Sequence, residues 1–398
     1  MSARSRRLAA CLTLALASLA WNAAAVAQSA PKRYQNTYRE LESELSAFQR
    51  RLPPVSAGKT PIRAATLSSA NCQRGEIMLN DAERDAALRE LDALKSTGAD
   101  GIVLQVCYPL LTPAFRDPQP FLDYYANLAN AVRARDMKLL VEHVALLPAY
   151  ASVDARPYYA KLTKQRFAKE RFDELKTILL ALQPDYLTLV SEPRTQSAGL
   201  QLTVKDWRSY VQRSVESLTQ QLGSFPTLLG AGSGLWEDFG YVEAFAGIKG
   251  LGYIDLHLFP IAAGGQNNLD RLMEWPDRIR RIDPDKRIVV SEFWLYKSGV
   301  AETFKLPLDL NASARNVFSF WGPLDQKFLR VVGVAAREKG IELIAPFWSR
   351  YFFAYVDYND PLTFRLNAKD LMGLANQRAY EAIQRGQVTD TGLVFRDM

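Results

Sequence analysis

The chain has 398 residues, of which 48% are hydrophobic and 23% charged, the composition of an ordinary globular protein. Its formal net charge is +6 and falls to +3 without the three arginines near the N-terminus. A surface so nearly balanced, with no basic stripe, gives no electrostatic basis for nucleic-acid binding. The length would allow two or three domains, although some folds of this size form a single unit.

The first 27 residues have the three parts of a secretory signal peptide. Arginines precede the apolar run 8–19, and an A-x-A cleavage site ends at Ala27. We therefore expect residues 1–27 to be removed on export, to the periplasm or beyond the cell. The apolar run is too short and alanine-rich for a membrane span, and no later stretch qualifies. An uncleaved anchor is the alternative.

Apolar residues recur at alternating spacings of four and three from Tyr34 to Leu52, which indicates one face of a helix. Pro53 then ends the pattern. We expect residues 28–60 to form a leader and an amphipathic helix that closes the bottom of the following domain. A short coiled coil with a partner is the alternative, but fewer than three heptads are available.

From residue 61 onward, apolar β-prone runs alternate with amphipathic helical segments. The predicted strands are 62–67, 101–108, 138–146, 186–192, 227–230, 253–259, 287–294 and 342–348. The predicted helices are 81–96, 120–135, 164–182, 204–222, 241–248, 269–282, 324–339 and 367–385.

This alternation implies a parallel sheet, and eight units imply that it closes into a (β/α)8 TIM barrel spanning residues 61–398. An open doubly wound sheet is the alternative. It would need a glycine-rich first turn, whereas residues 68–71 read Ser-Ser-Ala-Asn. The least regular stretch, 306–322, is interpreted as an active-site loop.

Two cysteines, Cys72 and Cys107, lie outside the signal peptide. Cys72 follows the first predicted strand and Cys107 closes the second, which places both at the top of the barrel. An even number of cysteines in an exported protein favours a disulfide between them. Two buried free thiols are the alternative.

Two predicted strands each contain a glutamate at or near their carboxyl end: 186–192 ends in Ser191-Glu192, and 287–294 contains Glu292. The ends of parallel barrel strands meet at one rim, where active sites of this fold are built. We therefore expect Glu192 and Glu292 to face each other. Two unrelated carboxylates are the alternative.

Other side chains suited to chemistry or binding fall at neighbouring strand ends or in the loops beyond them. The candidates for substrate binding are His143, Ser191, Trp236, His257, Trp294, Tyr296 and Trp348. Strand alternation turns either Glu142 or His143 inward, and His143 is preferred. Each tryptophan taken alone is as well explained by core packing, and each histidine by a structural role.

This arrangement resembles clan A of the retaining glycoside hydrolases over residues 62–385. Members of that clan carry the acid/base glutamate on strand four, the nucleophile on strand seven and often a tryptophan at the end of strand eight. The resemblance assigns these roles to Glu192, Glu292 and Trp348. Two departures stand out: Ser191 replaces the usual asparagine, and Phe259 replaces a tyrosine on strand six.

The resemblance implies retaining hydrolysis of a β-linked polysaccharide or oligosaccharide, with Glu292 ionised as nucleophile and Glu192 protonated as acid/base. No cofactor is expected, and two histidines without a near partner argue against a catalytic zinc. A transglycosylase would use the same residues. A barrel that binds polysaccharide without cleaving it, in an export or biofilm apparatus, is the alternative from another class. The sequence does not indicate an oligomeric state.

Overall fold

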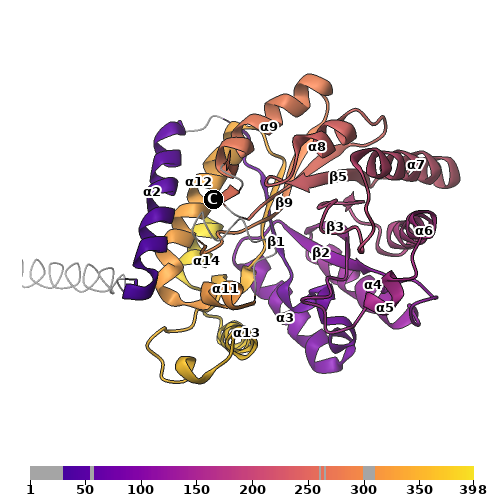
Figure 1. Ribbon diagram of the computed structural model, residues 1–398. Coiled ribbons are helices and arrows are strands. Elements are labelled where there is room, and N and C mark those ends of the chain that lie inside the picture. Colours follow the sequence, from indigo (N-terminus) through magenta and orange to yellow (C-terminus); the bar gives the residue numbers. More distant parts are fainter. Residues whose placement is uncertain (1–29, 54–57, 260, 264–265, 299–309) are drawn as a thin grey trace, which may run out of the picture.

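The computed structural model describes residues 30–53, 58–259, 261–263, 266–298 and 310–398. Within these ranges eight parallel strands close into a barrel in the order β1, β10, β9, β6, β5, β4, β3 and β2 (Figure 1). Their bounds are β1 Ile62–Thr66, β2 Gly101–Tyr108, β3 Lys138–Ala145, β4 Tyr186–Thr188, β5 Leu228–Gly234, β6 Tyr253–Leu258, β9 Arg287–Phe293 and β10 Leu343–Pro346. The expected (β/α)8 TIM barrel is confirmed.

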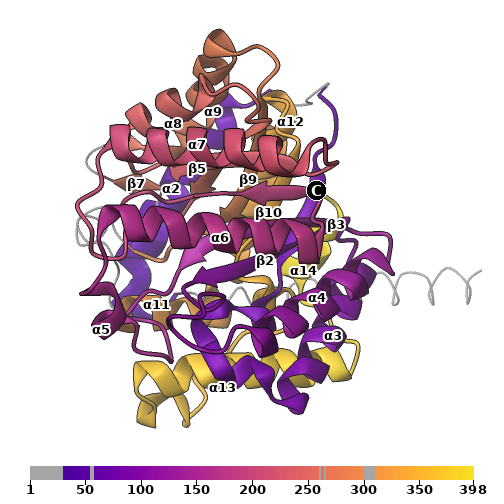
Figure 2. The same ribbon diagram turned by 90° about the vertical axis from the view of Figure 1, so that its right-hand side faces the viewer.

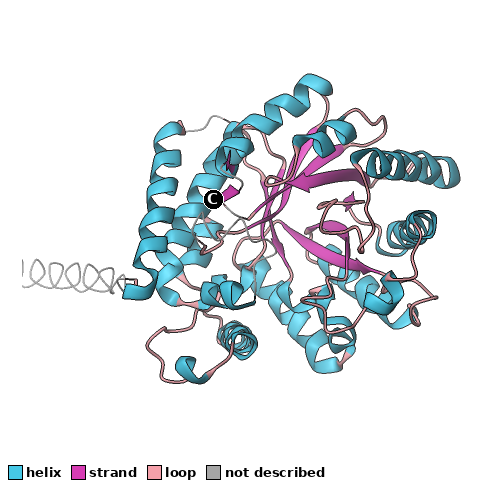
Figure 3. Cartoon of the chain, in the orientation of Figure 1, coloured by secondary structure: helices cyan, strands magenta, loops and turns pink. Residues whose placement is uncertain are grey.

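Helices surround the strands, as the cyan and magenta of Figure 3 show, and Figure 2 shows α6 and α7 side by side across the outside of the barrel. The helices that follow the strands are α3 Asp81–Ser96, α4 Gln119–Arg133, α5 Arg156–Tyr159, α6 Lys164–Leu182, α7 Val204–Leu222, α8 Phe239–Ala246, α9 Asn268–Ile282, α11 Leu310–Ala314, α12 Gly322–Glu338, α13 Ala368–Gln384 and α14 Asp390–Arg396. A small hairpin, β7 (Ala262–Ala263) and β8 (Gln266–Asn267), precedes α9.

The expected N-terminal helix is α2 (Gln35–Arg51), but it lies against α12 on the outside of the barrel and does not close the bottom of the barrel, which was its expected position (Figure 1). Its buried face consists of Leu41, Leu45 and Phe48, which belong to the predicted apolar stripe. No helix in the described ranges has both the length and the apolar character needed to cross a membrane. The predicted signal peptide, 1–27, lies outside these ranges.

The predicted loop 306–322 is only partly described, because residues 299–309 lie outside the described ranges. From residue 310 onward this stretch forms α11 and two short 3-10 turns, Arg315–Val317 and Ser319–Trp321. It is therefore more regular than the sequence indicated.

The inside of the barrel changes from apolar to polar toward the carboxyl ends of the strands. The apolar layer is a closed cluster of inward-facing side chains: Ala64, Val103, Leu140, Tyr186, Tyr253, Val289, Leu343 and Ala345. One inward position further along the strands lie Gln105, Glu142, Thr188, Asp255 and Ser291, all buried. The apolar layer therefore supports a polar layer below the rim, where TIM-barrel sites are built.

A register shift in β9 determines what faces the interior. Asp255 pairs with Val289 but His257 pairs with Glu292, so β9 advances three residues while β6 advances two. The same shift recurs against β10. This is the geometry of a β-bulge, which re-aims side chains beside active sites. Because of it, the consecutive residues Ser291 and Glu292 both point into the barrel.

The cysteines lie at the top of the first strands, where the sulfurs of Cys72 and Cys107 are bonded and the Cα atoms are 5.5 Å apart. The neighbouring Gln73 donates from its amide to the Ala145 carbonyl at the end of β3, and accepts from the Leu147 amide. Disulfide and glutamine together link the segment after β1 to the ends of β2 and β3.

Candidate active site

Glu192 and Glu292, expected to face each other, do so at the carboxyl ends of the strands. One carboxylate oxygen of each, together with a ring nitrogen of His257, lie within 4.8 Å of one another. The Glu192 side chain is 15% exposed and that of Glu292 6%. Glu192 therefore lies nearer the opening, and Glu292 lies deeper in the barrel.

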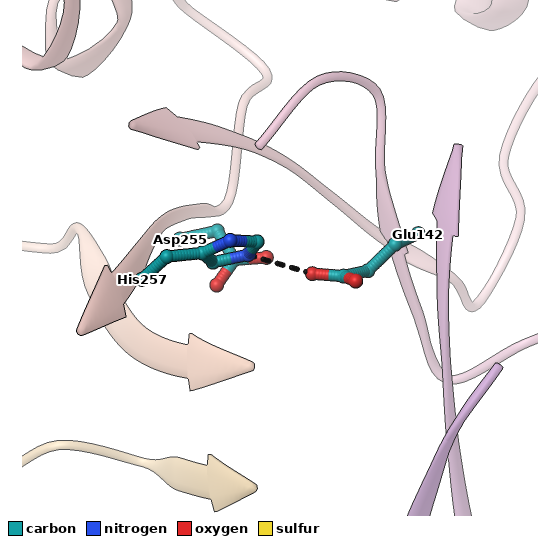
Figure 4. Close-up of side chains that lie close together, drawn as sticks. All are labelled: Glu142, Asp255 and His257. Carbon is teal, nitrogen blue, oxygen red and sulfur yellow. Dashed lines mark hydrogen bonds and ion pairs between the residues drawn. The ribbon is translucent and has the colours of Figure 1, made fainter. Parts of the chain in front are cut away.

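His257 connects this pair to a third carboxylate. Its Nδ1 lies 2.9 Å from Glu192 Oε1 and 3.6 Å from Glu292 Oε2. Its Nε2 lies 2.9 Å from Glu142 Oε1 and 3.1 Å from Ser291 Oγ. In Figure 4 the Glu142 carboxylate reaches across from β3 to the imidazole on β6. The ring is thus held between carboxylates at both nitrogens.

Below the histidine, hydroxyl groups connect buried carboxylates. Ser291 Oγ lies 2.5 Å from Glu142 Oε1 and 2.6 Å from Asp255 Oδ1, and Thr188 Oγ1 donates to Asp255 Oδ2 at 2.7 Å. A serine hydroxyl carries one hydrogen, so it donates to one of its two carboxylates at a time. Burial and the charge of Glu142 raise the pKa of Asp255 to about 6.

Gln105 joins the deep and upper parts of the site. Its Nε2 donates to Glu142 Oε2 at 3.2 Å and also to Glu292 Oε1. Gln105 stands two residues before the disulfide-bonded Cys107 on β2. Strand β2 thus carries both the disulfide-bonded Cys107 and a donor to the expected nucleophile.

The charges in the cluster depend strongly on one another. Burial opposes ionisation of Glu142, but the His257 charge and hydrogen bonds outweigh it and lower the Glu142 pKa to about 2. Burial also opposes a charge on His257, yet the adjacent Glu292 and Glu142 raise its pKa well above the ordinary value. Glu142 and His257 thus form a buried ion pair.

The pKa shift of Glu292 runs against its expected role as an ionised nucleophile. Burial, followed by the negative charge of Glu142, raises the pKa of Glu292 well above its usual range. In the ligand-free protein the proton expected on Glu192 therefore has a competing position on Glu292. Sequence reasoning could not find the part of this effect that comes from Glu142, which was expected to point outward.

His143 does not lie in the site, and the preference for His143 over Glu142 as the inward side chain is wrong. His143 points to the outside of the barrel, where its Nε2 lies 2.7 Å from Glu174 Oε2 on α6. Burial, then the charge of Arg171, lower the His143 pKa well below its usual value. Strand β3 is buried on both faces, so its sequence carries no alternation that would reveal its orientation.

Partly exposed aromatic rings lie at the mouth around Phe259. Its ring centroid is 5.1 Å from that of Tyr296 and 6.0 Å from that of Trp236. The Phe347 ring contacts both Phe259 and the partly exposed Trp348, at 5.5 Å and 4.6 Å. Trp236, Tyr296 and Trp348 therefore belong to one aromatic mouth, as the strand ends indicated.

Trp294 is different, and its expected role as a sugar-stacking ring is wrong. It is fully buried, and its ring packs on Tyr351 and Phe352 with centroids 5.5 Å and 6.3 Å away. No face of the ring is open to a ligand, so Trp294 is a core residue. The sequence offered no sign that distinguishes it from Trp348.

Ser191, next to the expected acid/base residue, is buried and already paired. Gln196 Nε2 donates to Ser191 Oγ at 2.9 Å. From the loop after β5, Glu237 accepts from the Arg194 amide at 3.1 Å and from the Ser233 hydroxyl. Burial raises the Glu237 pKa to about 7. Gln196 and Glu237, which sequence reasoning did not select, fix the segment that carries Glu192.

Two overlapping groups have the ligand types and spacing for a metal ion: Glu142 with Asp255 and His257, and Glu192 with His257 and Glu292. Both depend on His257. A protonated imidazole donates from both nitrogens and has no lone pair to offer a cation. A cation bound here would therefore have to displace a proton from His257.

No protein-family model matches the sequence, and no curated protein sequence matches it. The fold is similar to that of an exo-β-1,4-mannosidase from Opitutaceae bacterium strain TAV5, with a TM-score of 0.51 and 14% identity. That match covers 82% of this chain, which spans only 60% of the mannosidase.

A GH53 catalytic domain from Ignisphaera aggregans also matches, with a TM-score of 0.46 and 15% identity. The match covers 76% of this chain and 88% of that domain. Endo-glycoceramidase II from Rhodococcus sp. matches at TM-score 0.47 and 12% identity, over 75% of this chain and 76% of that one. The match to the mannosidase shows that the two chains share the barrel fold.

Proposed function

We propose that the protein is an exported glycoside hydrolase that cleaves a β-linked polysaccharide or oligosaccharide with retention of configuration. The observation that carries this proposal is the approach of Glu192 and Glu292, whose nearest groups lie within 4.8 Å. Retaining enzymes hold their two carboxyl groups about 5–5.5 Å apart, whereas inverting enzymes leave room for a water between them.

In the first step of this reaction, a Glu292 oxygen bonds to the anomeric carbon as the glycosidic C–O bond breaks. Glu192 gives its proton to the departing oxygen. In the second step a water molecule gives a proton to Glu192, and the water oxygen displaces Glu292 from the anomeric carbon. The greater exposure of Glu192 suits a group that meets the leaving group and then water.

Glu292 must be ionised to attack, although burial and Glu142 raise its pKa. Two neighbours favour its carboxylate form: the His257 imidazolium at 3.6 Å and the donating amide of Gln105. The proposed cycle therefore begins with transfer of the Glu292 proton to Glu192, which then gives it to the departing oxygen.

The aromatic mouth supports a carbohydrate substrate. Trp236, Tyr296 and Trp348 are partly exposed at the mouth and offer flat apolar faces to a ligand.

Export is supported by the signal-like N-terminus, and it predicts that the mature protein begins at Gln28. Mass spectrometry of the N-terminal peptide from the native host checks this point, and a chain retaining residues 1–27 would contradict it.

The test of the activity is a panel of β-linked glycans, including β-1,4-mannan, β-1,4-galactan and β-1,4-glucan, monitored by ¹H NMR. We expect cleavage of at least one, with the β-anomer as the first product. An α-anomer would contradict retention. Binding without cleavage across the panel would instead indicate a polysaccharide-binding barrel, and products longer than the substrate would indicate a transglycosylase.

A further inference from the structure

Glu142 has no direct part in the proposed reaction, yet it is a fully buried carboxylate at the centre of the site. It accepts from Gln105 at 3.2 Å and from Ser291 at 2.5 Å, and lies 2.9 Å from His257 Nε2. Burying a carboxylate is costly unless charged or hydrogen-bonding partners compensate. The partners here lead directly to the two glutamates.

The position of His257 indicates which protons it carries. Carboxylates flank both ring nitrogens: Glu142 at Nε2 and Glu192 at Nδ1, each at 2.9 Å. The ionised Glu142 only accepts hydrogen bonds, so Nε2 carries hydrogen, and the ring is doubly protonated when Nδ1 also donates to the Glu192 oxygen that bears no proton. That form of the ring is the imidazolium.

We propose that Glu142 is a positioning residue that acts through His257: its carboxylate keeps the imidazole doubly protonated and oriented, so that Nδ1 donates to Glu192 beside Glu292. The inference rests on the proposed hydrolase for its catalytic consequence, but the protonation of His257 is a property of the protein alone. The Glu142 pKa of about 2 agrees with a permanently ionised partner.

Every element packed against the ring contributes to its charge balance. The titratable and polar groups that face His257 are Glu142 on β3, Glu192 after β4, Asp255 on its own strand, and Ser291 and Glu292 on β9. Among the described residues, His257 is the cationic group within ion-pair distance of Glu142, Glu192 and Glu292. The imidazolium is therefore the cation that compensates these carboxylates.

The consequence for the reaction follows from the charge that develops on Glu192. When Glu192 gives its proton to the departing oxygen, it becomes a carboxylate that accepts the Nδ1–H of His257. His257 keeps both of its protons, so the proton balance of the reaction is unchanged. The same positive charge, 3.6 Å from Glu292, favours the ionised nucleophile.

The chain offers a matched control on the opposite face of the same strand. His143, adjacent to Glu142, forms a second buried histidine–glutamate pair with Glu174 at 2.7 Å, away from the site. The sequence contains only these two histidines, so an untagged protein labelled with ¹⁵N-histidine gives two imidazole spin systems. Glu142→Gln and Glu174→Gln each change one pair.

The experiment records ¹⁵N–¹H spectra of these imidazoles from pH 5 to 9. In wild-type protein we expect His257 to remain doubly protonated across this range and His143 to remain neutral. Glu142→Gln is expected to lower the His257 pKa by about two units or more, so that the ring titrates within this pH range. Glu174→Gln is expected to alter His143 and leave His257 unchanged.

A neutral His257 in wild-type protein, or a titration unaffected by Glu142→Gln, overturns the inference. The wild-type spectrum alone decides the first point. If Glu142→Gln does not fold, Glu142→Asp retains the charge but withdraws it by one methylene, and is expected to lower the His257 pKa by a smaller amount.

The catalytic part is tested on a phenyl β-glycoside of the sugar that the panel identifies. Glu142→Gln is expected to lower kcat about 100-fold with little change in KM, and to shift the pH profile with the His257 titration. An unchanged pH profile overturns the positioning role. If no glycan is cleaved at all, the proposed hydrolase fails while the NMR result still decides the His257 protonation.

Discussion

Glu142 and His143 are adjacent in sequence, yet their side chains lie on opposite faces of the barrel wall. Glu142 points inward to His257, and His143 points outward to Glu174 on α6. Each forms a buried histidine–carboxylate pair. The outer pair is a structural contact between β3 and α6, whereas the inner pair belongs to the candidate active site.

The acid/base role of Glu192 predicts a dependence on the leaving group. Glu192→Ala is expected to lower kcat about 100-fold or more on a phenyl β-glycoside, which needs protonation to depart. The leaving group of a 2,4-dinitrophenyl β-glycoside departs without protonation. Glu192→Ala is therefore expected to form the glycosyl-enzyme from this substrate at nearly the wild-type rate. Azide is expected to restore turnover and yield a β-glycosyl azide. Equal losses on both substrates in pre-steady-state measurements would contradict the role.

The raised pKa of Glu292 predicts how activity depends on pH. Glu292 attacks only as a carboxylate, so activity is present above its pKa and lost as the pH falls through it. Because burial and Glu142 raise that pKa, the acidic limb is expected well above the usual range of a glutamate. The measurement is kcat/KM on a dinitrophenyl β-glycoside. A profile that stays flat down to about pH 4.5 would contradict it.

Glu174 predicts a pH dependence of stability. Burial raises its pKa to about 8, above the value of an unfolded glutamate. A carboxyl group with a raised folded-state pKa stabilises the fold while protonated, and this contribution is lost as the pH rises toward 8.

Glu174→Gln cannot ionise, so its Tm relative to wild type is expected to rise between pH 5 and pH 9. Other buried carboxyl groups are present in both proteins and cancel in the difference. Thermal unfolding of the two proteins across this range makes the comparison. A difference that stays constant or falls would show that Glu174 remains ionised.

The two tryptophans expected to stack on sugar are predicted to behave differently. Trp294 is fully buried, so Trp294→Ala is expected to cost about 3–5 kcal/mol of folding stability. Trp348 is partly exposed at the mouth, so Trp348→Ala is expected to raise KM several-fold with a small change in Tm. Calorimetry and steady-state kinetics separate the two effects. A raised KM without loss of stability in Trp294→Ala would reverse the assignment.

Much of the architecture was readable from the sequence because each strand–helix unit shows its own periodicity. The eight strands, the helix before them, and the meeting of Glu192, Glu292 and His257 follow from where apolar runs stop. The sequence marks the strand ends to within a few residues: β4 ends at Thr188, four residues before Glu192, and β5 runs on to Gly234.

The inner lining could not be read in the same way. Strands buried on both faces lack polar alternation, so nothing in the sequence showed that Glu142 rather than His143 faces inward. The bulge in β9, which turns both Ser291 and Glu292 inward, depends on pairing with β6 and β10. The protonation of Glu292 depends on both of these features.

The loss of hydrolysis in Glu292→Gln, measured beside Glu174→Gln on the same glycan, tests the central claim most directly. Both replace a buried glutamate by its amide, but only Glu292 lies within 4.8 Å of Glu192 and His257. We expect Glu292→Gln to lose at least about 1,000-fold in kcat/KM and Glu174→Gln to remain within about threefold of wild type. Hydrolysis by Glu292→Gln at a rate close to that of wild type would contradict the two-glutamate mechanism.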